Sequence, residues 1–388
     1  MTTEFKVFFD NESATQAQLD EIEEIVVEQE VNKVWEARIK IPVCVSDAGI
    51  WEGEEEPTRS EFTRVRVEIK HGKTDFVPLI EGVVVGQDME RSAIPGKSMQ
   101  TLIVHDDSAL LHREDKMEKY DAEKDSDIAR EIFKTQLGGE PQIDDTEKRP
   151  DSPAKAIVQP KTKMQILRAL AERYGNFYAY VLPGKNVGKS IGCFKTLPKL
   201  SDENLPPLVM FGEDRNLAEF NVSQNPQTAS DVVAATLNLR DKSVTTASSS
   251  YRDSTLLGEE AATGYNEQNV KKKRLPPGRG SLVDLESATK GEVEKSSFTL
   301  EAEGSVLPLC YDGVLSPYRM VPVLLSDSRF STNYVIFKVV HTLTRSHYTQ
   351  SFKMKGNAVS NKKDGTVPSV PQASAVIAVG FNAQVNIF

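Results

Sequence analysis

Residue types that often do chemistry occur in this chain, but their spacing does not form a catalytic motif. The segment Gly184-Lys-Asn-Val-Gly-Lys-Ser190 ends like a phosphate-binding loop. Such a loop needs a glycine five residues before its second glycine, and Pro183 occupies that position. The next residues, Ile191–Phe194, have the pattern of a strand, so no helix N-terminus would face a phosphate. We therefore predict a hairpin turn here.

Metal and nucleophile chemistry also lack support in the sequence. The histidines and cysteines are scattered without a zinc-binding spacing: His71, His105, His112, His341, His347, Cys44, Cys193 and Cys310. His341 lies within an apolar run and is interpreted as a strand histidine packed against a neighbour. The sequence predicts three reduced structural thiols, no metal, no cofactor and no catalytic residues.

The acidic and basic clusters are interpreted as surface or structural features. The pairs Asp106/Asp107 and Asp144/Asp145 are adjacent, and adjacent strand residues point to opposite faces. Glu54-Glu55-Glu56 reads as a loop tip. The basic run Lys271–Arg274 fits phosphate binding, a solvated loop or a contact between subunits.

Composition describes an ordinary globular chain. It has 388 residues, 39% hydrophobic and 27% charged, with a formal net charge of −10. The length predicts two to three domains, and the acidity argues against general attraction to nucleic acid. The N-terminus lacks a secretion signal and no apolar run is long enough to span a membrane, so we expect synthesis in the cytoplasm.

Short strands with period-two patterns dominate the first 115 residues. They are predicted at Trp35–Ser46, Phe62–Ile69, Leu79–Asp88 and Met99–Asp106. Gly82 and Gly86 in the third of these predict a bend or bulge of the kind found in barrels. The acidic stretch 14–31 fits either an amphipathic helix or a strand. We predict a first β-barrel over residues 1–115.

A helix–glycine–strand unit over Thr162–Val181 is the clearest local signal. Thr162 and Gln165 form a capping box, and Gly175 is placed to end the helix. Ile166, Leu170 and Tyr174 share one face and are predicted to be core residues. With a shorter helix at 126–137, this unit predicts an α/β domain over residues 116–219.

Strand patterns return towards the C-terminus. A second barrel is predicted over 220–241 plus 297–360, with 242–296 as a polar insertion that is at best partly ordered on its own. Residues 361–388 read as a linker and a C-terminal strand with Val379, Phe381, Ala383, Val385 and Ile387 on one side. That strand suits addition to another subunit or docking on its own domain.

Four segments, in this order, resemble the tail-hub proteins of contractile tails, which include myovirus central hubs, late control D proteins and the N-terminal half of VgrG spikes. They are Leu79–Gly86 with Met99–Leu111, Ser126–Phe133, Leu167–Tyr178 and Tyr334–Thr349. The third is similar to the family's "F-L-x-R-L-A-E-x-x-G-x-x-Y/F" segment. One departure is Tyr318, which stands where the family usually has the glycine of a "P-G" turn.

The resemblance implies a β-rich α+β fold, with two tail-hub β-barrels linked by a smaller α/β domain. It implies a structural hub, without enzyme activity, whose trimer forms a pseudo-six-fold ring that adapts a tail tube to a spike. The implied partners are two further copies of the chain, spike and tube proteins, and baseplate wedge or tape-measure proteins, with no specific nucleic-acid binding and no membrane span. The implied location is a virion tail baseplate or injection-machine particle, and an acidic surface would suit a lumen through which DNA or cargo slides.

Two other classes of function remain open on the sequence. One is a baseplate-associated cell-wall hydrolase, which needs a convergent acid pair or a metal site. The other is a receptor-binding tail protein with an aromatic-rich groove, against which the aromatic content of 7% argues mildly.

Overall fold

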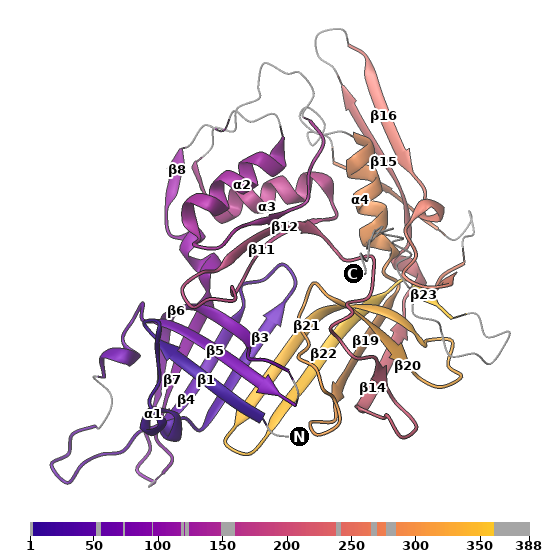
Figure 1. Cartoon of the computed structure of the whole chain (residues 1–388). Helices are drawn as coiled ribbons and strands as arrows, with labels where there is room; N and C mark the ends of the chain where they lie inside the picture. The colour runs from indigo at the N-terminus through magenta and orange to yellow at the C-terminus, as the bar shows by residue number, and fades with distance from the viewer. Residues whose placement is uncertain are drawn as a thin grey trace, which may run out of the picture.

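A large curled antiparallel sheet forms the body of the protein in a computed structural model (Figure 1). The structure describes residues 3–51, 56–72, 74–94, 96–117, 120, 124–148, 160–237, 242–264, 270–276 and 285–360. The main sheet has 13 strands, and its principal path runs β14-β19-β22-β21-β3-β4-β7-β6-β5-β1-β2. The predicted β-rich fold is therefore confirmed.

The N-terminal half of this sheet comprises β1 to β7. Their bounds are Thr3–Phe9, Glu12–Ser13, Glu24–Glu30, Glu36–Pro42, Arg64–His71, Val77–Glu90 and Met99–Asp106. The stretch left open between helix and strand contains both, because the capped helix α1 (Gln16–Glu21) leads directly into β3. The register shifts between Val84 and Gly86 in β6, which confirms the predicted bulge.

The C-terminal half comprises β13 (Leu208–Val209), β14 (Leu217–Gln224), β19 (Leu300–Val306), β20 (Met320–Leu324), β21 (Thr332–Thr344) and β22 (Tyr348–Gly356). Its long strand β21 changes partner along its length. Thr332–Val335 pair with β20, and Lys338–Thr344 pair with β3 of the N-terminal half. A bulge between Ile336 and Lys338 in its pairing with β22 lies at the change. The two halves are thus one continuous hydrogen-bonded sheet.

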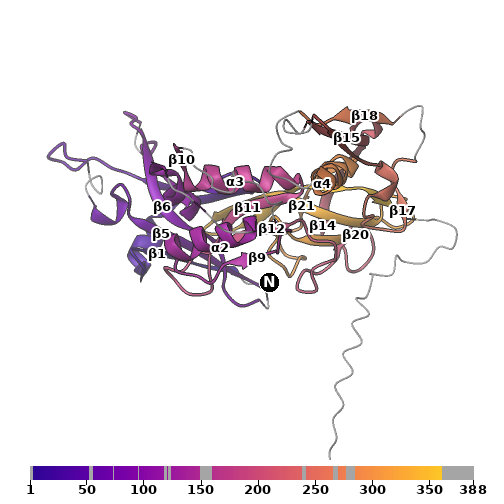
Figure 2. The ribbon, with the colours of Figure 1, turned by 90° about the horizontal axis from the view of Figure 1, so that it is seen from above.

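An α/β layer lies against the N-terminal half (Figures 1 and 2). The short 3-10 helix η2 (Asp107–His112) leads out of β7 towards it. The layer contains β8 (Asp115–Met117), α2 (Asp125–Gln136), β9 (Gln142–Ile143), β10 (Pro160–Thr162), α3 (Lys163–Tyr174), β11 (Phe177–Leu182) and β12 (Ile191–Thr196). The capping box of α3 is present, and Ile166, Leu170 and Tyr174 are buried. These core predictions are confirmed.

A smaller three-stranded sheet and a helix, which we call the wing, replace the expected insertion. The wing contains β15 (Ser230–Leu237), β16 (Val244–Ser249), β18 (Lys271–Arg274) and α4 (Leu285–Ser297). The expectation that residues 242–296 form a separate polar insertion is wrong in its described parts, because Val232 and Ala234 of β15 pack on Ala288 and Val293 of α4. For the same reason β15 is not part of the second barrel.

Two short strands complete the described fold, β17 (Glu260–Ala261) pairing with β23 (Ala358–Val359). Three large hydrophobic clusters lie in the N-terminal half, the C-terminal half and the α/β layer. Each half of the sheet therefore has its own core. The predicted C-terminal strand lies outside the described residues.

Candidate functional site: the junctions between the parts

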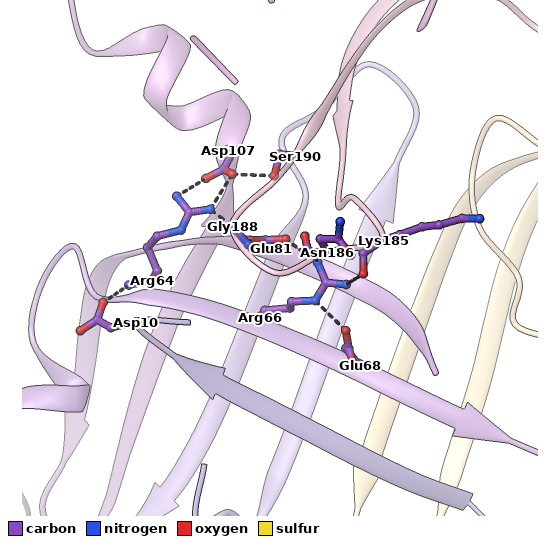
Figure 3. Close-up of polar contacts among 10 residues, drawn as sticks. All are labelled: Asp10, Arg64, Arg66, Glu68, Glu81, Asp107, Lys185, Asn186, Gly188 and Ser190. Atoms are coloured by element: carbon purple, nitrogen blue, oxygen red, sulfur yellow. Dashed lines mark hydrogen bonds and ion pairs between the residues drawn. The ribbon is translucent and has the colours of Figure 1, made fainter. Parts of the chain in front are cut away.

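The hairpin between β11 and β12 carries the sequence that imitates a phosphate-binding loop. It confirms the predicted turn, since Tyr180, Val181 and Leu182 pair with the strand that follows it. Gly188 has a φ of 79°, in the region that glycine favours. The tip of the hairpin rests on β5 and β6 of the large sheet (Figure 3). The segment thus joins the α/β layer to the N-terminal half.

Arg66 on β5 is the centre of this contact. Its side chain is 2% exposed, and its Nε and Nη1 donate to Glu68 at 2.7 Å and Glu81 at 2.5 Å. Its Nη2 also donates to the carbonyl of Lys185 at 3.3 Å, and its Nη1 to that of Asn186 at 3.5 Å. One buried guanidinium therefore binds two carboxylates of the sheet and two carbonyls of the hairpin.

Arg64 makes a second, parallel connection. Its Nη2 and Nη1 donate to the two oxygens of Asp107 at 2.8 and 3.2 Å. Burial opposes the charge of Arg64, but Asp107 and Glu81 outweigh it and raise the pKa of the guanidinium. Ser190 of the hairpin donates to Asp107 at 2.6 Å, and the backbone N–H of Gly188 donates to Glu81. Arg64, Arg66, Glu68, Glu81 and Asp107 form what we call the arginine–carboxylate network.

A pair of stacked tyrosines forms another junction. Tyr318 has a φ of 62°, the left-handed backbone expected for the glycine that the hub family has there. Its ring stacks on Tyr180 of β11 with 3.6 Å between centroids and 5° between planes. Its hydroxyl accepts a hydrogen bond from the backbone N–H of Asn32 at 2.7 Å. Tyr318 thus connects both halves of the sheet with the α/β layer.

The wing docks on the α/β layer through two glycines. A Cβ on Gly291 of α4 would lie 1.7 Å from the carbonyl oxygen of Tyr174, so only glycine allows this approach. Gly175, which ends α3 with a φ of 78°, lies against the backbone of α4. Asn176 donates to Glu294 at 2.6 Å beside this contact.

A polar seam separates the two hydrophobic cores of the sheet. On β21, Val339 belongs to the C-terminal core and Leu343 to the N-terminal core, with His341 between them. On β22, Gln350 likewise lies between Phe352 and Tyr348. Gln29 of β3 completes the seam of three buried polar side chains.

The hydrogen bonds of the seam fix the neutral form of His341. Gln29 uses its amide Nε2 to donate to the carbonyl of Leu79 at 2.7 Å, so its Oε1 accepts from His341 Nε2 at 3.4 Å. The hydroxyl of Tyr348 then donates to Nδ1 at 2.8 Å. Burial lowers the pKa of His341 to about 3. The predicted role as a packed strand histidine is confirmed.

Two solved structures of tail proteins have a similar fold along almost the whole chain. One is the 43 kDa tail protein of prophage MuSo2 from Shewanella oneidensis, with 14% identity and a TM-score of 0.61 over 91% of this chain and 98% of that one. The other is the tail protein from Neisseria meningitidis MC58, with 14% identity and a TM-score of 0.57 over 92% and 97%. The chain has the fold of phage tail proteins.

A chain of the Francisella PdpA–VgrG complex also has this tail-protein fold, with 11% identity and a TM-score of 0.50 over 96% of this chain and 60% of that one. No protein-family model matches the sequence, and no curated protein matches it. The resemblance to tail hubs is therefore confirmed at the level of the fold.

The remaining candidates for chemistry contact different partners. Asp106 accepts from the backbone N–H groups of Trp35 at 2.8 Å and Ser108 at 2.9 Å, whereas its neighbour Asp107 faces Arg64. His105 lies 3.3 Å from Glu36. Cys193 is buried, which raises the pKa of its thiol to about 12. Among the described residues no group of three or more His, Cys, Asp or Glu could hold a metal ion.

The basic run forms strand β18, an exposed edge of the wing that pairs with β15. Lys273 forms an ion pair with Glu292 of α4 at 2.5 Å. No helix in the described parts of the chain has the length and apolar character of a membrane span.

Proposed function

We propose that this protein is the structural central hub of a contractile tail or injection-machine baseplate. The observation that carries the proposal is the match of its fold to phage tail proteins over nearly the full length of both chains. A structural role also suits the described polar clusters, whose side chains are used in joining parts of the chain. The protein would then act through its interfaces and not as an enzyme.

The two halves of the sheet support a trimeric ring with pseudo-six-fold symmetry. Each half has its own core, and both follow one continuous sheet. Three copies would present six such units, the geometry needed between a six-fold tube and a three-fold spike. The proposed division is a first barrel up to residue 115, the α/β layer, the wing and a second barrel, with tube, spike, wedge or tape-measure proteins as neighbours in the baseplate.

One polar face of the sheet is a candidate for the channel lining. On it, lysines and glutamates pair across strands: Lys355 with Glu301 at 2.9 Å, Lys353 with Glu303 at 3.3 Å, Lys338 with Glu28 at 2.6 Å and Lys40 with Glu24 at 2.6 Å. Charges paired in this way leave little net potential to hold DNA or protein cargo. An assembled ring with this face on its outer surface would refute the assignment.

The hub proposal is tested by the mass and symmetry of the assembly. Light scattering at several concentrations, alone and with the tube and spike proteins of the same system, should give three copies of the chain. Electron microscopy of that complex should show a three-fold ring with six similar densities. A monomer at every concentration and with both partners present would overturn the proposal. Clearing of peptidoglycan by the purified chain would favour a cell-wall hydrolase instead.

A further inference from the structure

An open groove lies beside β20 and β23. It has a volume of about 430 Å³, within the range of ligand-binding clefts. Its apolar lining comes from three segments of the chain: Leu200, Leu256 and Leu257, and Val323 and Leu324. Ser360 is among its polar lining residues. Figure 2 shows β17 and β20 on the same side of the molecule.

The groove exposes aliphatic side chains that a partner would cover. Leu200 is 56% exposed and Leu256 is 38% exposed, and both line the same groove. Single exposed leucines are common, but two that line the same groove mark a candidate binding site. An extended segment with apolar side chains at alternate positions would fit such a surface.

The position of Ser360 points to one occupant. Ser360 follows β23, lines the groove and donates its backbone N–H to the carbonyl of Arg329 at 2.8 Å. The sequence continues from this point through residues 361–377, with Gly365, Pro368 and Pro371, to Ala378–Phe388. That last segment has no charged residue and alternates apolar with small or polar side chains. Its chemistry matches the groove.

We propose that Ala378–Phe388 docks in this groove of its own chain, with the side of Val379, Phe381, Ala383, Val385 and Ile387 against the leucines. The connector 361–377 can extend to about 60 Å at roughly 3.5 Å per residue, so it is long enough to turn back. A connector of this length keeps the segment at a local concentration in the roughly millimolar range. Docking within one chain is therefore favoured over docking on a second copy, and the inference does not depend on the hub proposal.

The test uses full-length chains and a labelled peptide of residues 374–388 carrying solubilising lysines at its N-terminus. In the variant Phe381→Asp/Val385→Asp, the segment should leave the groove. In the control Asn382→Asp/Asn386→Asp, the same two charges are added on the opposite side. Fluorescence anisotropy should show peptide binding to the first variant, and little binding to the wild type or to the control, whose grooves are filled.

A substitution in the groove tests whether the peptide binds there. Added to the open variant, Leu200→Glu should weaken peptide binding at least tenfold. Leu309→Glu, at a leucine that is 69% exposed and does not line the groove, should leave binding unchanged. Equal binding to wild type and open variant, no binding to either, or no effect of Leu200→Glu would overturn the proposal. A loss of assembly mass in the open variant, with none in the control, would assign the segment to a neighbouring copy and overturn docking within one chain.

Discussion

His341, the histidine of the polar seam, should make the stability of the protein depend on pH. His341 is buried and neutral, with a pKa lowered to about 3, while an unfolded chain has an ordinary histidine pKa of 6.5. A lowered histidine pKa means that the unfolded state binds the proton first. The contribution of His341 to stability is therefore complete above pH 6.5 and is lost as the pH falls towards 3.

Between pH 8 and pH 5, His341 should lower the free energy of unfolding by about 2 kcal/mol. This value is RT times the logarithm of a ratio, in which the term 1 + 10^(pKa − pH) of the unfolded state is divided by that of the folded state. The value depends almost entirely on the unfolded pKa, because at pH 5 a folded pKa of about 3 leaves His341 almost fully neutral in the folded state. His341→Gln should remove this loss. Its amide retains a donor for Gln29 and an acceptor for Tyr348, yet it does not titrate.

The assay is urea unfolding at pH 8, 6.5 and 5 at one protein concentration, followed by far-UV circular dichroism and by the fluorescence of buried Trp35. Between pH 8 and pH 5 the free energy of unfolding of the wild type should fall by about 2 kcal/mol more than that of His341→Gln. Burial raises the pKa of Asp106 to about 6, which acts in the opposite direction, but Asp106 is present in both proteins and cancels. The control His347→Gln, at an exposed histidine, should follow the wild type. Parallel pH dependences for wild type and His341→Gln would refute the reasoning.

Three further variants test the junctions and the core by chemical unfolding. Arg66→Met should cost about 3–5 kcal/mol because Glu68 and Glu81 lose the buried guanidinium that binds both of them. Arg38→Met, at an exposed pair, should cost less than about 1 kcal/mol. Equal costs would show that the network is not stabilised by Arg66. Gly291→Ala should destabilise by about 1–3 kcal/mol because its Cβ would lie 1.7 Å from the Tyr174 oxygen. Gly264→Ala, with nothing within 4 Å, is its control, and a matching effect there would contradict the close-contact explanation. Leu170→Asp should abolish folding, and a soluble variant with wild-type circular dichroism would show that α3 is not buried as described.

Local structure was predictable where a single segment carried enough signal. The capping box at Thr162 and Gln165, the stop at Gly175 and the apolar side of the helix all lie within one short stretch, and the structure has each of them. The same holds for strand Met99–Asp106, whose bounds match the prediction. These features depend on neighbours in sequence, so they need no knowledge of tertiary partners.

The wing was missed because its signals depend on partners distant in sequence. Helix α4 has few apolar residues, and its closest approach to α3 is made by Gly291, which lowers helix propensity in isolation. Strand β18 is a run of four basic residues with none of the usual strand character. Only the pairing with β15 makes it a strand. The amino-acid sequence of either segment alone therefore favours a loop.

The polar seam left a trace in the sequence, where a polar side chain takes an inward position within a period-two apolar pattern. The arginines of the network left no such trace, because Arg66 lies on the side of β5 opposite the core residues Val65 and Val67. His341 lies between Val339 and Leu343, and Gln350 lies between Tyr348 and Phe352. Burying such groups costs free energy unless they are hydrogen-bonded, so an inward polar residue on a strand predicts a buried partner. The identity of that partner comes only from the fold.

The partner change along β21 explains why polar groups are concentrated where the two cores meet. One strand serves both halves, so its inward side chains pass from one core to the other between Val339 and Leu343. An apolar residue at position 341 would merge the cores and weaken the discrimination against a slip of β21 by two residues along β3, because such a slip keeps every side chain on its own face. The hydrogen bonds of His341 to Gln29 and Tyr348 are directional and are satisfied in one register only. The seam therefore fixes how the two halves meet, as the proposed ring would require of each chain.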